Sequence, residues 1–529
     1  MKRLLLTVLS LMISLTTPYA GQTEHYFRFQ IKDRCELEQL TRLISIDNVK
    51  GDTVFAYASD REMDNFKKLD YTITALPHPG TLIVPEMSTN PEDLAGWNTY
   101  PSYDTYVAVM RQFEINYPEL CVIERAGYTV MGRELLYARI SDNVHENENE
   151  PEVQYSSSIH GDETTGYVLM LRLIDSLLTS YGTDPAITQL INNMEIWINP
   201  LANPDGTYMG GNASVSGAIR YNANYVDLNR NLPDPSLGPH PDYLVWQPET
   251  IDLMNFVAPH NFVLSANFHG GAEVVNYPWD TWEKLHPDDT WFRDISRLYA
   301  DTAQEYSAPG YMNDCEDGIT NGYDWYCISG GRQDYMTYFR GCREVTIELS
   351  FTKLPQASTL PTYWEYNRVS LFNHLRNALY GIHGVVIDAY TGLPLSATIT
   401  VLTHDADGSQ VFTEPEIGDF HRLIAPGNYD LEITAENYVT DTIFGVTVVD
   451  QQATTVNIEM EPLYVCGDVN DDGSLDPLDI NYLVAFIYKG GPVPPIWPAA
   501  DVDGSGEIDP LDLTYLIDFI YKGGPLPIC

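Results

Sequence analysis

The stretch Val153-Gln-Tyr-Ser-Ser-Ser-Ile-His-Gly-Asp-Glu163 is the most informative part of this chain. It begins with an apolar strand candidate and ends in a His-x-x-Glu pair, in which His160 and Glu163 can bind one metal ion. A second histidine, His269 in the run Ala-Asn-Phe-His-Gly-Gly, can complete a three-ligand set. Three protein ligands with a fourth position open are typical of catalytic zinc sites. The spacing alone is weak evidence, because such pairs also occur on solvated turns.

Strand and helix patterns alternate around this pair, between about residues 101 and 381. Strand candidates lie at residues 153–158, 194–199, 263–268 and 344–349, and the clearest helix candidates at residues 168–178 and 363–378. This alternation predicts an α/β domain whose mainly parallel or mixed sheet is covered by helices on both faces. His160 and His269 each follow the end of a strand candidate, where the ligand sites of open α/β sheets lie.

The N-terminus predicts export. A basic start, an apolar run at residues 4–15 and a small-residue exit predict a secretory signal peptide over residues 1–22. The apolar run is too short to span a bilayer, which needs about 20 residues. No later stretch is apolar enough for a membrane helix, so we expect a secreted protein without a membrane span.

The charge balance bears on the partners. The 529 residues include 74 acidic and 29 basic side chains, a net charge of −45. We expect no nucleic acid partner, because such a field repels the phosphate backbone. The same field attracts cationic substrates and divalent metals.

The length predicts several domains. Residues 23–97 predict a small α+β module, with strands at residues 25–31, 53–57 and 71–76 and helices at residues 37–44 and 61–68. A Pro-rich connector ends this module, and residues 98–382 hold the α/β domain. Residues 383–462 predict a β-sandwich, because short strands alternate there with Gly, Pro and Asp turns. Residues 463–529 form the last segment.

Two copies of an Asp-rich loop stand in that last segment: Asp468-Val-Asn-Asp-Asp-Gly-Ser-Leu-Asp-Pro-Leu-Asp479 and Asp501-Val-Asp-Gly-Ser-Gly-Glu-Ile-Asp-Pro-Leu-Asp512. Oxygen side chains at loop positions 1, 3, 5, 9 and 12, with Gly at position 6, match the calcium-loop pattern, although position 12 is Asp rather than Glu. We expect two structural Ca²⁺ ions with these ligands: Asp468, Asn470, Asp472, Asp476 and Asp479 in the first loop, and Asp501, Asp503, Ser505, Asp509 and Asp512 in the second. Cys466 and Cys529 bracket the loops, and we expect them to form a disulfide.

Glu348 is a further site candidate. It stands inside the apolar run Thr346-Ile-Glu-Leu-Ser350, where an unpaired carboxylate is costly. The alternative role is a structural glutamate paired with Arg332 or Arg343.

Several motifs carry a resemblance to a known family: His160-Gly-Asp-Glu163, Asn203-Pro-Asp-Gly206, Asp227-Leu-Asn-Arg-Asn-Leu-Pro-Asp234, His269-Gly-Gly, Trp325-Tyr326 and Glu348-Leu-Ser350. The chain resembles the zinc metallocarboxypeptidases, and within them the carboxypeptidase N/E/D-like, or regulatory, branch. The resemblance covers about residues 100–460, since that branch carries a transthyretin-like sandwich directly after its catalytic domain. It implies a mixed eight-stranded sheet flanked by helices in residues 98–382.

The resemblance also implies a peptide-hydrolysing centre. His160, Glu163 and His269 would hold one Zn²⁺, with water in the fourth position. Glu348 would be the general base that deprotonates this water. Arg220 would stabilise the oxyanion of the tetrahedral intermediate.

The remaining implied residues bind the substrate. Asn229 and Arg230 would hold the terminal carboxylate of a peptide, and Tyr326 would close over it. In the resembling branch, residues at the positions of Asp280 and Gln333 serve a Lys or Arg side chain. With the acidic field, this implies removal of C-terminal Lys or Arg.

Two modules leave alternatives open. The tandem calcium loops resemble a dockerin, which in bacteria binds cohesin domains, so a cohesin-type scaffold is the implied partner. The alternative is a calcium-stabilised terminal module without a cohesin. Residues 23–97 are a candidate propeptide over the cleft, although the regulatory branch generally lacks an inhibitory prosegment.

Two other functions fit the same fold. One is a catalytically silent module that binds peptide C-termini, and the intact ligands and Glu348 argue against it. The other is an amidohydrolase acting on a non-peptide amide, and Asn229-Arg230 favours a free carboxylate substrate instead.

Overall fold

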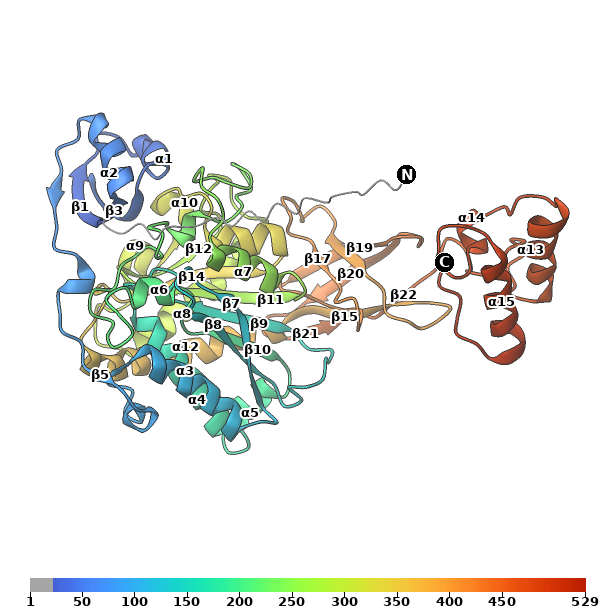
Figure 1. Ribbon diagram of the computed structural model, residues 1–529, viewed down its shortest axis with the longest axis horizontal. Coiled ribbons are helices and arrows are strands. Elements are labelled where there is room, and N and C mark those ends of the chain that lie inside the picture. Colours follow the sequence, from blue (N-terminus) through green and yellow to red (C-terminus); the bar gives the residue numbers. More distant parts are fainter. Residues whose placement is uncertain (1–21) are drawn as a thin grey trace, which may run out of the picture. The chain divides into compact units, whose positions relative to one another are not determined.

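A computed structural model describes residues 22–529, so the predicted signal peptide, apart from its last residue, lies outside the described residues. The chain divides into two compact units. Figure 1 labels their helices and strands and colours them along the sequence. The first unit extends to Leu379 and includes residues 407–409, and the second holds Tyr380–Ala406 and Gln410–Cys529. Within the described part of the chain, no helix has both the length and the apolar composition needed to cross a membrane.

An eight-stranded sheet forms the centre of the first unit, in the order β13-β12-β14-β11-β9-β10-β8-β7. Strands β14, β11, β9 and β10 are parallel neighbours, and β12 and β8 join them in antiparallel orientation. This confirms the predicted mixed sheet. The strands are β7 (Cys121–Tyr128), β8 (Glu134–Ile140), β9 (Glu152–Ser157), β10 (Glu195–Asn199), β11 (Phe262–His269), β12 (Glu273–Tyr277), β13 (Ile319–Asn321) and β14 (Arg343–Leu349).

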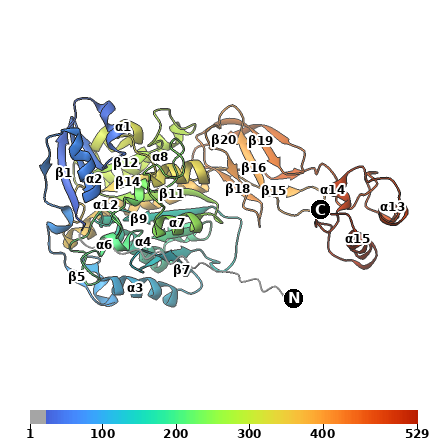
Figure 2. The ribbon, with the colours of Figure 1, turned by 45° about the horizontal axis from the view of Figure 1, so that its top comes forward.

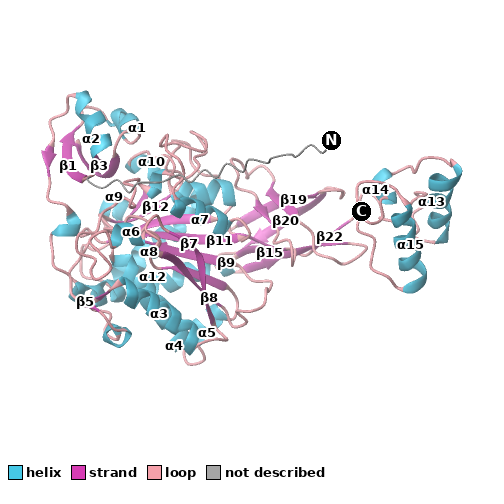
Figure 3. Ribbon diagram, in the orientation of Figure 1, coloured by secondary structure: helices cyan, strands magenta, loops and turns pink. Residues whose placement is uncertain are grey.

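Helices cover both faces of this sheet (Figure 3). α8 shows why: Phe292, Ile295, Tyr299 and Ala303 are buried and recur at helical spacing, which gives one apolar face. Buried positions extend almost around α4, so this helix is enclosed by other elements. The helices are α3 (Tyr103–Asn116), α4 (Thr165–Ser180), α5 (Pro185–Ile191), α7 (Pro248–Val257), α8 (Asp289–Glu305) and α12 (Leu360–Arg376).

The N-terminal module (residues 23–97) is built on an antiparallel sheet in the order β2-β3-β1-β4. Phe27, Phe29 and Phe66 are buried in its core. The predicted helix at residues 37–44 is shorter, α1 (Leu37–Leu40), and the predicted strand at 71–76 shrinks to β4 (Thr74–Ala75). The other elements are β1 (Glu24–Gln30), β2 (Ser45–Lys50), β3 (Thr53–Ser59) and α2 (Asp60–Phe66).

Strand β2 was not expected from the sequence. Its pairing with β3 slips between Ile46 and Asn48, so Asp47 is an extra residue in a β-bulge. The bulge breaks the alternation of apolar and polar residues by which strands are recognised.

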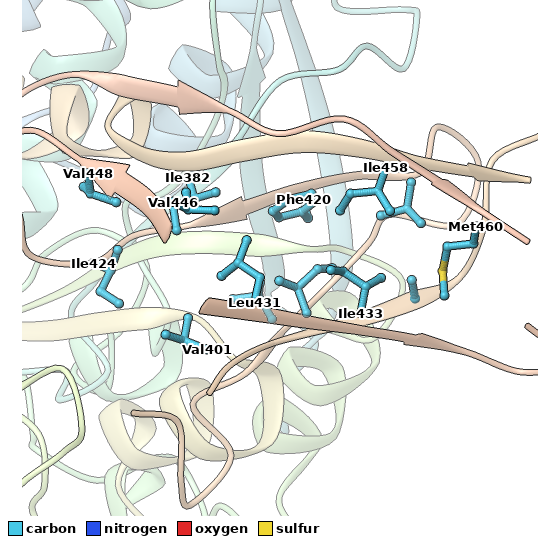
Figure 4. Close-up of a cluster of buried hydrophobic side chains, with 14 residues drawn as sticks. Ile382, Val401, Phe420, Ile424, Leu431, Ile433, Val446, Val448, Ile458 and Met460 are labelled. Atoms are coloured by element: carbon cyan, nitrogen blue, oxygen red, sulfur yellow. The ribbon is translucent and has the colours of Figure 1, made fainter. Parts of the chain in front are cut away.

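Two four-stranded sheets make up the sandwich of the second unit. Their inner side chains, among them Ile382, Phe420, Leu431 and Ile433, point toward one another in Figure 4. The strands are β15 (Gly381–Asp388), β16 (Ala397–Val401), β17 (Val411–Phe412), β18 (Asp419–Arg422), β19 (Gly427–Ala435), β20 (Asp441–Val448), β21 (Ala453–Thr455) and β22 (Ile458–Met460).

The sequence repeat at the end of the chain becomes two packed helices, α13 (Pro477–Lys489) and α15 (Pro510–Lys522), drawn in Figures 1 and 2. Each starts with a capping Asp followed by Pro and ends at a left-handed Gly, as local propensity favours. The short α14 (Trp497–Ala500) connects them. The expected disulfide joins Cys466 to Cys529.

Replacing both Cys466 and Cys529 by Ser should lower the free energy of unfolding of the terminal repeat. The disulfide spans a sequence separation of 63, and the lost restriction of the unfolded chain corresponds to about 4 kcal/mol. Hydrogen exchange of the α13 and α15 amides in the full chain measures this loss. Cys35→Ser, which changes an exposed free cysteine, is the control, and equal exchange in all three proteins would contradict the expectation.

Candidate functional site

The three expected metal ligands meet at the carboxyl edge of the central sheet. His160 and Glu163 occupy the turn after β9, and His269 is the last residue of β11. Glu163 Oε2 lies 3.0 Å from His160 Nδ1 and 2.9 Å from His269 Nδ1, and the two Nδ1 atoms are 3.1 Å apart. All three residues are buried. Three donor atoms therefore converge on one point.

The surroundings of these ligands suit zinc. His160 Nε2 lies 3.2 Å from Asp227 Oδ1, and the amide of Asn267 faces His269 Nε2 at 2.8 Å. Neighbours of this kind fix the ring tautomer that presents the opposite nitrogen to a metal. Burial lowers the pKa of His269 to about 4, so this imidazole is neutral at pH 7. Neutral imidazole is the form that binds zinc.

Glu163 is held ionised. Burial acts to raise the pKa of this carboxyl, but its interactions with His160 and then Lys353 outweigh burial and hold the pKa well below its usual range. Ionised carboxylate is the ligating form, and the donor set fits Zn²⁺.

Glu348 lies next to His269 because β14 and β11 are parallel and their register aligns these two residues. It is buried, and within residues 22–529 its Oε2 has no hydrogen-bond partner. Burial, and then the nearby charge of Glu163, raise the pKa of Glu348 well above its usual range. A buried carboxyl with a raised pKa suits proton transfer.

The structural alternative for Glu348 does not hold. Arg332 pairs with Glu344 at 3.1 Å, and Arg343 pairs with Asp288 at 2.7 Å. Arg343 is also an odd number of residues from Glu348 on β14, so its side chain points to the other face of the sheet.

One small cavity of about 30 Å³ is lined by nearly all the expected residues of the catalytic centre, namely His160, Glu163, His269, Glu348, Arg220, Tyr326, Asn229, Arg230 and Asp280. Gln333 is the exception. It is buried on α11 (Arg332–Asp334), outside the lining of this cavity, and neither of its amide atoms has a hydrogen-bond partner in the described chain.

Asp227 organises the cationic side of the cavity. Its Oδ2 accepts from Arg220 Nε at 3.3 Å, and its Oδ1 accepts the Asn229 N–H at 2.8 Å. Burial acts to raise the pKa of Asp227, but Arg220 and the cations beside it hold the pKa well below its usual range. Arg220 Nη1 also donates to Glu163 at 3.1 Å. The Asp227 carboxylate thus positions both the zinc ligand candidate His160 and the guanidinium of Arg220.

Asp280 is a buried carboxyl in the lining of the cavity. Its Oδ1 accepts from Asn276 Nδ2 at 3.0 Å. A Cβ at Gly322 would come within 1.8 Å of the same oxygen, so only glycine leaves space there. Burial raises the pKa of Asp280 to about 6.

Sequence reasoning missed Asp227, Asn267, Lys353 and Asp47. Asp227 stands inside the Asp227–Asp234 motif, but the motif alone does not indicate that Asp227 orients His160. Lys353 follows β14, and its Nζ lies 2.6 Å from Glu163 Oε1. Asp47 lies far away in the sequence, and no local pattern marks it.

The second calcium loop brings three expected ligands together, since carboxylate oxygens of Asp501, Asp503 and Asp512 lie within 4.8 Å of one another. Ser505 Oγ lies 3.4 Å from Asp501. Asp509 instead caps α15 by accepting the Leu511 N–H.

In the first loop, the carboxylates of Asp468 and Asp479 accept backbone N–H groups of the loop. Asn470 donates to Asp472 at 3.0 Å. Asp476, like its counterpart in the second loop, caps a helix, here α13.

Three family models match successive parts of the chain. A zinc carboxypeptidase model matches residues 106–370, a carboxypeptidase regulatory-like domain residues 381–461, and a dockerin type I domain residues 466–521.

Individual relatives agree with these matches. Carboxypeptidase D of Mus musculus is 37% identical over 416 residues, which cover 73% of this chain and 29% of that protein. This chain therefore spans less than a third of that relative. Carboxypeptidase E of Caenorhabditis elegans is 33% identical over 423 residues, covering 71% of this chain and 89% of that protein. The structure of carboxypeptidase A from Helicoverpa armigera shares the fold, with a TM-score of 0.51 and 19% identity over 66% of this chain and 97% of that one.

Asp227→Asn should weaken zinc binding about 10–100-fold, because the neutral amide no longer holds the His160 ring as the carboxylate does. Competition with a chelator of known affinity measures the zinc dissociation constant without any reliance on activity. Asp104→Asn, at an exposed position on α3, is the control. An unchanged constant would show that Asp227 does not orient His160.

Proposed function

Because the chain belongs to the zinc carboxypeptidase family, we propose that it is a zinc-dependent carboxypeptidase that hydrolyses the C-terminal bond of peptides and proteins. The observation that carries this proposal is one cavity that holds three converging metal donors, a buried carboxyl with an unpartnered oxygen and two guanidinium groups. A module that only binds peptides needs no general base, so a buried Glu348 beside the metal ligand candidates favours an enzyme.

Each residue of the centre has a defined task. Zinc held by His160, Glu163 and His269 would supply a Lewis acid for the scissile carbonyl and the attacking water. Glu348 accepts the proton of that water and passes it to the leaving amine. Arg220 stabilises the negative charge that develops on the carbonyl oxygen.

The exopeptidase character comes from the other end of the cavity. Asn229 and Arg230 hold the terminal carboxylate of the substrate, for which a planar guanidinium is well shaped. Arg230 Nε has no hydrogen-bond partner in the described chain and is available to donate. Tyr326 closes over the bound residue. Only the last peptide bond then reaches the zinc ligands.

Asp280 supports a preference for C-terminal Lys or Arg. A buried carboxylate in a binding cavity gains most from a cationic side chain, because the alternative is an uncompensated charge. Gln333 is assigned to the same subsite by the family resemblance, and it lies outside the lining of the cavity.

The other modules complete the proposal. Residues 1–22 export the chain, residues 98–382 carry catalysis and residues 383–462 form the transthyretin-like sandwich. Residues 463–529 bind two Ca²⁺ ions and attach the enzyme to a cohesin-type scaffold outside the cell. The dockerin match and the three clustered aspartates of the second loop support this placement.

Glu348→Gln should lower kcat by about 10²–10⁴-fold, the usual contribution of a general base. The assay follows release of the last residue from peptides ending in Arg, Lys, Phe or Glu by the full zinc-loaded chain. Glu365→Gln, an exposed change on α12, is the control and should leave the rate of release unaltered. A chelator should abolish release by the unaltered chain. Release that survives the chelator or the Glu348→Gln change would overturn the mechanism.

The preference for basic residues should depend on pH through Asp280. This carboxyl loses its charge as the pH falls through its pKa of about 6. The KM for Arg-ending peptides should therefore rise about tenfold between pH 7 and pH 5, as the ionised fraction falls. Phe-ending peptides and the Asp280→Asn variant should lack this additional rise. Parallel pH profiles for both peptides in the unaltered chain would remove Asp280 from the specificity site.

A further inference from the structure

A segment of the N-terminal module lies in the catalytic cavity. We call residues 45–48 the inserted segment, and its Asp47 is part of the cavity lining. Asp47 Oδ1 lies 2.6 Å from Lys353 Nζ and 3.5 Å from Arg220 Nη1. Its side chain is only 5% exposed. An acidic side chain therefore occupies the position beside the guanidinium that stabilises the oxyanion.

The backbone of the inserted segment contacts the substrate-holding residues. The Ile46 carbonyl accepts from Arg230 Nη2 at 3.3 Å, and the Asp47 carbonyl accepts the Tyr326 hydroxyl at 3.2 Å. Ser45 Oγ accepts from Arg220 Nε at 2.8 Å. The side chains proposed to bind the substrate carboxylate, stabilise the oxyanion and close over the substrate are thus hydrogen-bonded to the inserted segment. They are Arg230, Arg220 and Tyr326.

The β-bulge in β2 directs this contact. Asp47 is the extra residue between the pairs Ile46–Ala56 and Asn48–Phe55. A bulge re-aims a side chain, and here it aims a carboxylate at two buried cations. Burying this carboxylate is costly without those cations, so the arrangement is stable only while the module covers the cavity.

Further contacts hold the module over the same edge. Glu24 accepts the backbone N–H groups of Arg220 at 3.0 Å and Tyr221 at 2.9 Å. Tyr57 donates its hydroxyl to Asp162 at 2.7 Å, within the His160–Glu163 turn. These bonds attach the module to the turn that holds two of the three metal ligand candidates and to the loop that holds the oxyanion guanidinium.

Resting on the proposed function, we propose that the N-terminal module is an internal competitive inhibitor whose inserted segment occupies the subsite of the substrate carboxylate. Substrate and inserted segment cannot both engage Arg220 and Arg230. Relief requires that the module leave the cavity. The connector that ends the module offers a place for cleavage, since Leu82 is 60% and Val84 87% exposed.

Asp47→Ala in the full chain should raise kcat/KM for an Arg-ending peptide at least about tenfold, mainly through a lower KM. Asp52→Ala, an exposed change in the turn after β2, should leave it unchanged. A chain cut at a protease site inserted between Leu82 and Ile83 should gain more than the uncut chain. Equal kcat/KM in wild type, Asp47→Ala and the cut chain would overturn the proposal.

Asp47→Asn guards against loss of folding. It keeps the size of the side chain and removes its charge, so it should give an intermediate gain in kcat/KM in a chain that still unfolds cooperatively on heating. If Asp47→Ala unfolds, the absence of any gain in a folded Asp47→Asn chain would equally overturn inhibition by the inserted segment.

Binding separates this inference from the proposed activity. A fluorescent Arg-ending peptide should bind Glu348→Gln/Asp47→Ala at least about tenfold more tightly than Glu348→Gln. Equal affinities refute the inserted segment as a competitor even if the enzyme is active. If Asp47→Ala hydrolyses no peptide while the affinities differ as expected, the proposed activity fails and the occlusion stands.

Discussion

The parallel register of β9, β11 and β14 is the constraint on which the site depends. It sets His269 beside Glu348 and ends β9 where the His160–Glu163 turn begins. A slip by one residue would turn a side chain to the opposite face of the sheet and remove it from the cavity. The register is specified by continuous burial, since all residues of β11 and β14 are buried. The same packing that stabilises the domain thus positions its chemistry.

Buried charge is the second determinant. Glu163, Asp227 and Asp47 lie among Arg220, Lys353 and the imidazoles, and no member of this group is solvated. Removing one member of such a network leaves an uncompensated charge, which costs about 3–5 kcal/mol. Each carboxylate therefore has a structural duty besides its chemical one. Bound zinc would add positive charge next to Lys353 and loosen the hold of Glu163 on the cations around it.

Local patterns sufficed for most of the fold. β9, β11 and β14 were predicted because their residues form short apolar runs, and α4 and α12 because their apolar residues recur at helical spacing. The zinc ligand candidates and Glu348 stand in recognisable motifs. Gln333 was assigned through the resemblance, which does not specify how the loop between Tyr326 and Gln333 turns. β2 escaped because its bulge places Asp47 next to Asn48 and removes the alternation. The pairing of Asp47 with Arg220 and Lys353 joins distant parts of the chain, and such contacts leave no periodic trace.

The inserted segment and a basic peptide do not compete on equal terms. The tether gives the segment an effective concentration in the millimolar range or above, so contacts that are individually weak can keep it in place. Yet Ser45, Ile46, Asp47 and Asn48 bring no cation, and they leave the Asp280 subsite without a positive partner. On the proposed function, a peptide ending in Arg would supply both a carboxylate for Arg230 and a guanidinium for Asp280. On this function, the occluded state would therefore exclude neutral and acidic C-termini more strongly than basic ones, and Asp280 would also decide which ligands can displace the module.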